Sequence, residues 1–417
     1  MGWQDYSLLS LARQGLSGNR GWKQAWRSPA PKKKYQVVII GGGGHGLATA
    51  WYLAREHGIR DIAVLEKGWI GGGNTGRNTT NVRSDYMFSE SAAMYDKALK
   101  LYEDFARELN FNIMLSQRGW VTLFHDQHQM ESARHKLNWM RCNGIDAEIL
   151  DRAALAKLIP GLRADNPRWP VLGAVLQQRG GTIRHDAVAW GYARGADRMG
   201  IDIIQNCEVK GFTREGDRIT AIDTSRGTIG CDSVGVAVAG HSSVIADMAG
   251  FRLPVTSRCL QAMVSEPIRP ILDVAMISPA TGVYLNQTQK GELVMGAMLD
   301  PGQSYGQRGG PRTVQKVVEA AVELFPAFGQ ARLMRHWGGI VDIVPDSSPI
   351  IGATPVSNLY INCGWGTGGF KAIPVGGLML AHAIATNRPH PLAEKFGLDR
   401  FRDNRLVDEG AASGIAH

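Results

Sequence analysis

The chain has 417 residues, which is long enough for two domains or for one nucleotide-binding domain with an inserted partner. Its 44% hydrophobic and 20% charged residues are those of an ordinary soluble globular protein. The net charge of +8 suits an anionic cofactor, an anionic substrate or an acidic partner protein, but Lys32–Lys34 is the only basic run, which argues against nucleic-acid binding.

Residues 1–34 are too apolar for a free tail, because they include Trp3, Leu8, Leu9, Leu11, Trp22 and Trp26. We predict an N-terminal arm that wraps on its own domain or on another subunit. The same region has no uninterrupted apolar core, so we expect no signal peptide. The longest apolar stretch, Ala372–Ala385, is shorter than the roughly 20 residues that span a bilayer, so we expect no membrane segment.

The five cysteines are odd in number and include no CxxC pair. This usage favours a reduced, cytoplasmic protein over a disulfide framework or a zinc site.

The stretch Tyr35–Glu66 has the order of a dinucleotide-binding βαβ unit. Val37–Ile40 is a predicted strand, Leu47–His57 a predicted helix, and Ile62–Leu65 a second strand that ends at Glu66. A glycine turn, Gly41–Gly46, joins the first strand to the helix. A glycine turn without a ligand is the alternative, but strand, helix and acid all agree with the nucleotide-binding interpretation.

Each part of this unit has an expected role. Gly41 permits the tight turn, Gly43 lets the backbone approach a pyrophosphate, and Gly46 lets the helix pack against the strand. The N–H groups at the helix N-terminus, at Gly44 and His45, face the phosphates. An acid at position 66 accepts hydrogen bonds from ribose hydroxyls, which fits FAD or NAD and argues against NADP.

A polar, glycine-rich loop follows at Gly71–Asn78. Its Asn74, Thr75, Arg77 and Asn78 are candidates for holding a flavin and its pyrophosphate, with a flexible surface loop as the alternative. Arg77 and Arg83 are each able to clamp a carboxylate bidentately.

Gly180–Asp186 precedes a helix predicted over Ala187–Met199. We expect Asp186 to cap this helix and His185 to lie just outside its first turn. By position alone, His185 is a surface residue beside a cap.

The remaining elements follow from periodicity and turn residues. We predict helices over Glu90–Glu108, Gln127–Asn143, Leu150–Leu158, Thr313–Leu324 and Pro374–Thr386, and strands over Gly119–Phe124, Ile201–Ile204, Cys207–Phe212, Arg218–Thr224, Ser233–Ala239, Leu260–Val264, Val283–Asn286, Leu293–Ala297 and Leu359–Asn362. A second glycine turn lies before the last helix and contains Gly364, Gly366, Gly369 and Lys371. We expect this turn to direct the N-terminal end of the helix dipole at a flavin. The tail after Arg402 is predicted to be loose.

Together these segments resemble the D-amino-acid-oxidase-like flavoproteins, and among them the β subunits of heterotetrameric sarcosine oxidases. The matching motifs are Gly41–Gly46 with Glu66, Gly73–Asn78, Arg184–Gly191, Pro345–Pro349 and Gly364–Lys371. The resemblance implies an α/β fold with a Rossmann-like FAD-binding domain and an interleaved substrate domain built on a mixed or antiparallel sheet. The FAD-binding domain would comprise 35–110, 181–250 and 336–405, and the substrate domain 111–180 and 251–335, between the arm at 1–34 and a loose tail at 406–417.

The resemblance also implies a chemistry. FAD would be held non-covalently at the Gly41–Gly46 turn, Glu66 and the Asn74 loop, with Val209 near the adenine. FMN would be joined covalently to His185, and Lys371 would bind the substrate carboxylate. The implied reaction is oxidative demethylation of sarcosine, with electrons passing from FAD to FMN and then to O2 to give H2O2. Partner α, γ and δ subunits are implied, with NAD and tetrahydrofolate on the α subunit.

Two departures from the monomeric relatives limit this transfer. Their FAD-bearing cysteine is replaced here by Trp337–Ile340, so covalent FAD attachment is excluded at that place. Their substrate-site lysine and histidine are also missing, with Val294 and Met298 near those positions. The alternatives are an FAD-dependent dehydrogenase of glycine, proline or D-amino acids without FMN, and a non-catalytic FAD-binding scaffold subunit.

Overall fold

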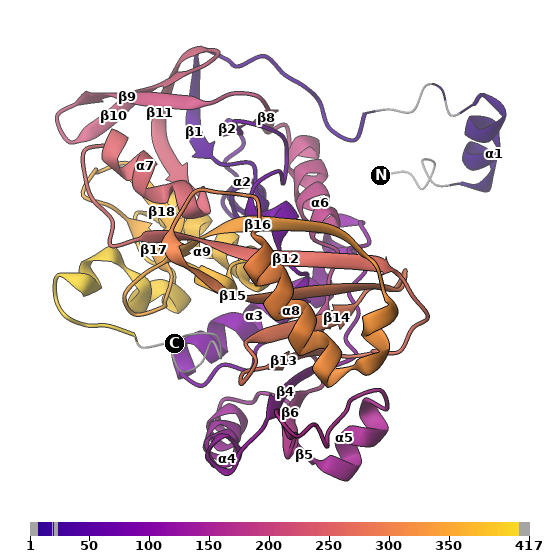
Figure 1. Cartoon of the computed structure of the whole chain (residues 1–417). Helices are drawn as coiled ribbons and strands as arrows, with labels where there is room; N and C mark the ends of the chain where they lie inside the picture. The colour runs from indigo at the N-terminus through magenta and orange to yellow at the C-terminus, as the bar shows by residue number, and fades with distance from the viewer. Residues whose placement is uncertain (1–6, 19, 21–23, 408–417) are drawn as a thin grey trace.

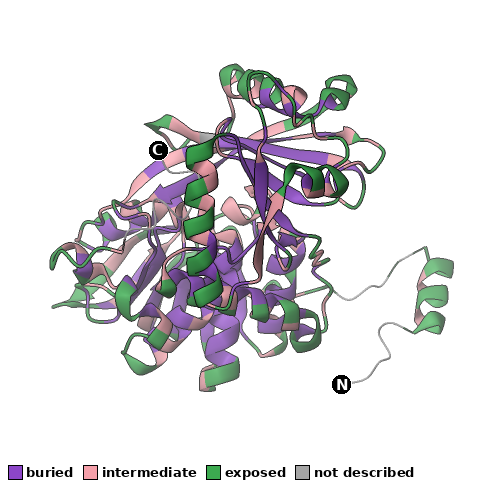
Figure 2. Ribbon diagram, turned by 90° about the horizontal axis from the view of Figure 1, so that it is seen from below, coloured by how far each residue is buried: buried purple, intermediate pink, exposed green. Residues whose placement is uncertain are grey.

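The computed structural model describes residues 7–18, 20 and 24–407. Within these residues the strands form two eight-stranded sheets and one two-stranded ladder, surrounded by helices (Figure 1). Buried residues occupy the middle of the molecule, and the outer faces of the helices are exposed (Figure 2). No helix in this part of the chain is long and apolar enough to cross a membrane.

The first sheet has the strand order β17-β18-β11-β1-β2-β8. Its central strand, β1, lies parallel to both of its neighbours, β11 and β2, and is almost fully buried. This burial on both faces explains why Val37–Ile40 reads as a continuous apolar run. The strands are β1 (Lys34–Ile40), β2 (Ile62–Leu65), β8 (Asp202–Ile204), β9 (Val209–Glu215), β10 (Arg218–Thr224), β11 (Gly227–Val236), β17 (Ile350–Ala353) and β18 (Leu359–Cys363), with β9 and β10 forming a hairpin beside β11.

Four helices pack around this sheet and one another: α2 (Gly44–His57), α3 (Ser89–Leu109), α6 (His185–Arg198) and α9 (Ile373–Thr386). The face of α2 that meets its neighbours carries Leu47, Ala50 and Leu53, all with no exposed surface. Gly58 ends α2 in the left-handed conformation, with φ of 69°. The helix N-terminus is therefore fixed at the end of β1, where the glycine turn lies.

The second sheet has the order β16-β12-β15-β14-β13-β4-β6-β5. It is mostly antiparallel, but β13 and β4 are parallel. Helix α8 crosses this sheet, and α4 and α5 lie at its far end beside β5 and β6 (Figure 1). The elements are β4 (Trp120–Phe124), α4 (Gln127–Cys142), β5 (Ala147–Asp151), α5 (Arg152–Leu158), β6 (Gly173–Gln177), β12 (Thr256–Pro267), β13 (Ala275–Ser278), β14 (Val283–Gln287), β15 (Glu292–Gln303), α8 (Pro311–Leu324) and β16 (Leu333–Ile343).

Three short elements complete the fold: the ladder of β3 (Asn81–Val82) with β7 (Gly181–Thr182), and α7 (Ser242–Met248). Within the described residues of the predicted arm, 1–34, two parts differ in their contacts. Arg27 pairs with Asp197 and Asp202, and so fixes the residues before β1 on their own domain. Helix α1 (Leu8–Leu16) stands apart and buries no residue (Figure 1). The tail was predicted to be loose after Arg402, but this is wrong for residues 403–407, because Val407 bonds to the buried Asp346 and Ser348. The rest of the predicted tail, residues 408–417, lies outside the described residues.

The predicted helices are confirmed to within a few residues. The helix predicted over Leu150–Leu158 begins two residues later, at Arg152, because Leu150 and Asp151 end β5. One prediction about a helix start is wrong. Helix α6 begins at His185, so this residue lies inside the first turn, and the cap position is Arg184 rather than Asp186. Asp186 instead accepts the N–H of Ala187 and pairs with Arg184.

Candidate active site

A cavity of about 450 Å³ lies where the carboxyl ends of β1, β2 and β11 face strand β16 of the second sheet. Clefts of this size, at the carboxyl ends of parallel strands, are the usual place for cofactors in such sheets. Most of the residues predicted from the sequence to hold a flavin or a substrate carboxylate line this cavity: Gly41, Gly43, Gly44, His45, Glu66, Asn74, Thr75, Arg77, Asn78, Val209, Gly366, Gly369, Arg83 and Lys371. Gly46, Gly364 and His185 are not among its lining residues in the described chain.

The glycine turn after β1 depends on two glycines. Gly41 has φ of 112°, and a Cβ there would overlap the carbonyl oxygen of Ala237 on the neighbouring loop. A Cβ on Gly46 would overlap the carbonyl of Gly41, so only glycine allows α2 to start this close to β1. The N-terminus of α2 therefore directs the positive end of the helix dipole into the cavity.

Glu66 follows β2 and bonds to the backbone of both flanking loops. Its carboxylate oxygens accept the N–H of Gly42 at 2.9 Å and the N–H of Gly68 at 2.8 Å. A carboxylate has about four acceptor positions, so two remain available to ribose hydroxyls. Val209 and Cys207 line the same end of the cavity, where an adenine would lie.

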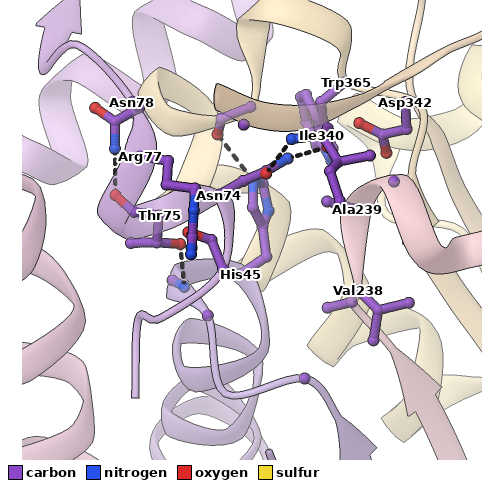
Figure 3. Close-up of a pocket in the computed structure, with 18 of the residues that line it drawn as sticks. His45, Asn74, Thr75, Arg77, Asn78, Val238, Ala239, Ile340, Asp342 and Trp365 are labelled. Carbon is purple, nitrogen blue, oxygen red and sulfur yellow. Dashed lines mark hydrogen bonds between the residues drawn. The ribbon is translucent and has the colours of Figure 1, made fainter. Parts of the chain in front are cut away.

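The loop Asn74–Asn78 is held by its own side chains (Figure 3). Asn74 donates to the carbonyl of Ile340 and accepts the N–H of the same residue at 2.9 Å. Thr75 accepts the N–H of Gly44 at 2.9 Å, so it caps the first turn of α2. Arg77 donates to the carbonyls of Gly72 and Gly73, within its own loop. The loop is thus fixed between α2 and β16.

A buried network around His45 supports the second glycine turn. The imidazole Nε2 lies 2.8 Å from the carbonyl oxygen of Gly369, and Nδ1 lies 3.2 Å from the amide nitrogen of Asn362. Because a carbonyl only accepts, Nε2 carries the proton and Nδ1 accepts. Burial lowers the pKa of His45 to about 4, so the ring is neutral. His45 thus joins the phosphate-binding helix to the turn that carries Lys371.

Two buried cations lie at the other end of the cavity. Lys371 is 8% exposed, and its Nζ donates to the carbonyl of Thr367 at 3.2 Å. Burial, together with the nearby charge of Arg83, lowers the pKa of Lys371 well below its usual value. Arg83 is paired with Asp85 and stacks over Tyr86 and Trp120. Among the described residues Lys371 has no carboxylate within ion-pair distance, and a buried ammonium of this kind is a ready binding point for an anionic group.

Many of the lining residues were not singled out from the sequence, and three of these bear on the chemistry of the site. Trp120 and Tyr284 line the cavity from β4 and β14 of the second sheet, and the indole N–H of Trp120 has no partner in the described chain. Asp342, at the end of β16, accepts the N–H of Gly364 at 2.5 Å, while burial raises its pKa to about 6. In the sequence, Trp120 and Tyr284 look like ordinary strand residues. Asp342 could be suspected only because a turn rich in proline and serine, Pro345–Pro349, follows it.

His185, at the start of α6, is not among the residues that line this cavity. Its Nδ1 is buried and has no hydrogen-bond partner among the described residues. Burial lowers the pKa of His185, which favours a neutral, nucleophilic imidazole. The neighbouring carboxylate of Asp186 accepts hydrogen bonds from Arg184 at 2.7 and 2.8 Å, and among the described residues it has no bond to the imidazole.

These residues fit FAD. The glycine turn that has no room for a Cβ at Gly41, Gly44 or Gly46, the dipole of α2, the carboxylate of Glu66 and a cavity of ligand size are what an adenine dinucleotide requires. The unpaired Nδ1 of His185 is compatible with a covalent substituent on that ring.

Comparison with known proteins agrees with this geometry. The family described as "DAO: FAD dependent oxidoreductase" matches residues 36–383. The chain is 49% identical over 412 residues to sarcosine oxidase subunit beta of Rhodobacter capsulatus, which covers 99% of both chains. It is 50% identical over 393 residues to sarcosine oxidase subunit beta of an Arthrobacter species, covering 94% of this chain and 97% of that one.

Solved structures share the fold. L-proline dehydrogenase from P. horikoshii superposes with a TM-score of 0.85 at 26% identity, over 90% of this chain and 100% of that one. Glycine oxidase from Geobacillus kaustophilus has a TM-score of 0.80 at 22% identity, over 88% of this chain and 99% of that one.

Proposed function

Because the chain belongs to the DAO family of FAD-dependent oxidoreductases and is about half identical to sarcosine oxidase β subunits, we propose that it oxidises sarcosine to glycine by oxidative demethylation. Flavin-dependent amine oxidation is the general activity of these relatives, and sarcosine is the proposed substrate. The observation that carries the proposal is the buried Lys371, which lies in the same cavity as the dinucleotide-binding turn.

The substrate end of the cavity suits a small amino acid. The ammonium of Lys371 binds the carboxylate, and Arg83, already paired with Asp85, adds positive charge behind it. Trp120 and Tyr284 add aromatic surface to the lining of the cavity, against which the apolar N-methyl group would pack. Binding the carboxylate at Lys371 turns the N-methyl group toward the flavin end of the cavity.

The cofactor assignments belong to the same proposal. The Gly41–Gly46 turn and Glu66 hold FAD without a covalent bond, and His185 bears FMN through a covalent bond to its ring. When bound, FAD would supply the two-electron oxidant for the amine, and FMN would supply the site for reduction of O2 to H2O2. His185 contributes a buried neutral imidazole with an unpaired nitrogen.

The relatives are named as beta subunits, and we propose that this chain likewise works in a heterotetramer with α, γ and δ subunits. The α subunit would carry NAD and pass the released one-carbon unit to tetrahydrofolate. We place the complex in the cytoplasm, which suits the five free thiols.

Denaturation of the purified protein tests the proposal against its main alternative, an FAD dehydrogenase without FMN. We expect one flavin to be released and one to stay on the polypeptide. Peptide mapping should then find this flavin on the peptide that contains His185. Release of all flavin, or a flavin peptide without His185, contradicts the FMN assignment.

A further inference from the structure

The turn that carries Lys371 has little regular structure of its own. Gly364 and Gly366 adopt positive φ angles of 74° and 52°, and two short 3₁₀ turns follow. Inside the turn, the N–H of Gly368 donates to the carbonyl of Trp365 and the N–H of Ala372 donates to the carbonyl of Gly369. Glycine-rich backbone of this kind has many accessible conformations. Side chains from neighbouring helices must therefore hold it in place.

Tyr102 of α3 provides such a hold. Its hydroxyl donates to the carbonyl oxygen of Phe370 at 2.7 Å, and its ring packs on the Phe370 ring with centroids 6.2 Å apart. The side chain is only 1% exposed, and burial raises its pKa well above the usual value, so the hydroxyl is a permanent donor. The Phe370 carbonyl belongs to the peptide unit whose nitrogen is that of Lys371. The bond from Tyr102 therefore fixes the plane from which the Lys371 side chain departs.

The neighbouring carbonyl is held from the other side. His45 of α2 donates to the carbonyl of Gly369, so two consecutive carbonyls of the turn are bonded to two different helices. With both carbonyls fixed, Lys371 reaches back to Thr367 and its ammonium stays in the cavity.

We infer that Tyr102 is a positioning residue for Lys371: its hydroxyl sets the peptide plane that aims the ammonium at the substrate carboxylate. The inference rests on the proposed function, in which Lys371 binds that carboxylate. Loss of the hydroxyl leaves a buried carbonyl unpaired, and the turn relaxes toward conformations that move the ammonium. A shift of the binding group by about 1 Å is enough to weaken a precisely oriented site substantially.

Tyr192 of α6 offers a matched control. It is also 1% exposed and packs in the same aromatic group, with its ring 4.9 Å from that of Phe105. Its hydroxyl bonds to Tyr52 and not to the turn. Tyr192→Phe therefore removes an equally buried hydroxyl beside the same helices without touching the carbonyls of the turn.

The test compares FAD-bound wild type, Tyr102→Phe and Tyr192→Phe. Three quantities are measured: KM and kcat for sarcosine, the Kd of propanoate from the flavin spectrum, and amide hydrogen exchange of peptides covering 364–372. Propanoate probes the carboxylate site without the amine. For Tyr102→Phe we expect KM and Kd to rise by about 5- to 30-fold, with a smaller change in kcat and faster exchange in the turn. Tyr192→Phe should stay within about twofold of wild type in all three.

Unchanged KM, Kd and exchange in Tyr102→Phe, or equal losses in Tyr192→Phe, would overturn the inference. Lys371→Met is measured in parallel, to distinguish failure of the role inferred for Tyr102 from failure of the role proposed for Lys371. If Lys371→Met weakens propanoate binding and Tyr102→Phe does not, the inference fails while the proposed function stands. If Lys371→Met has no effect, the proposed role of Lys371 fails, and hydrogen exchange alone still decides whether Tyr102 fixes the turn.

Discussion

Replacement of Lys371 by Met should weaken substrate binding and stabilise the fold at the same time. Lys371 is buried, and its pKa lies well below the usual value because burial and Arg83 disfavour its charge. Methionine is apolar and of similar length, so it fills the space without that charge. A hydrogen bond to a charged group contributes roughly 1.5–3 kcal/mol, which corresponds to about a 10- to 150-fold rise in the KM for sarcosine.

The sign of the stability change follows from proton linkage. The folded-state pKa of Lys371 is lowered, so unfolding takes up a proton in the pH range between that pKa and the ordinary value near 10.5. Stability therefore rises with pH across this range: the charged lysine destabilises the fold fully below the folded-state pKa, and this cost fades as the pH approaches 10.5. The Met variant should show a higher Tm, and the difference should be largest at low pH. The same lowered pKa means that propanoate binds most tightly at low pH and loses affinity as pH rises through it, well below 10.5. Lys371→Met should remove this pH dependence.

The assays are steady-state kinetics with sarcosine, propanoate titration across pH, and thermal unfolding of the FAD-bound protein. Lys100→Met, an exposed lysine on α3 paired with Asp96, is the control and should leave KM and the pH dependence unchanged. A normal KM and an unchanged pH profile in Lys371→Met would refute the reasoning.

Three further predictions concern other parts of the molecule. Glu66→Ala removes the acceptor of two backbone N–H groups and of the ribose hydroxyls, so FAD affinity should fall by roughly 2–5 kcal/mol while any covalent flavin stays; unchanged FAD content after gel filtration would speak against the site. His185→Asn should still accept electrons from sarcosine at FAD, but peroxide production should collapse; normal peroxide output would exclude an FMN on His185. Arg400→Ala leaves the buried Asp346 without its partner, so unfolding should become easier by roughly 3–5 kcal/mol, as measured by denaturant titration, and a near-neutral change would show that Asp346 is solvated or protonated there.

The nucleotide-binding half of the fold was predictable because its signals are local. The apolar run Val37–Ile40, the glycine turn and Glu66 lie within thirty residues and carry both the secondary structure and the ligand chemistry. The second sheet was less predictable. Strand β5 is only half-buried, so its sequence does not alternate between apolar and polar residues. Strand β6 is a short, fully buried segment between turn residues, so it also lacks the two-residue period of a half-exposed strand.

The candidate site likewise contains residues with a local sequence signal and residues without one. Glu66, Asn74 and Lys371 could be picked out because polar residues beside glycine turns are a sequence signal, and they do line one cavity. Contacts across long separations gave no signal. Tyr102 reads as one more buried position of an amphipathic helix, yet its hydroxyl meets a carbonyl 268 positions later in the chain. Its role depends on tertiary packing, which residue type and spacing do not encode.

Anaerobic mixing with sarcosine tests the central claim most directly. The FAD-containing protein is mixed with sarcosine in the absence of O2, and flavin absorbance near 450 nm is followed in time, with L-proline and glycine in parallel. The account predicts saturable bleaching by sarcosine, with the other two amines much slower, and a strongly weakened sarcosine dependence in Lys371→Met. Flavin that stays oxidised with sarcosine, or that is bleached faster by L-proline or glycine, would contradict it.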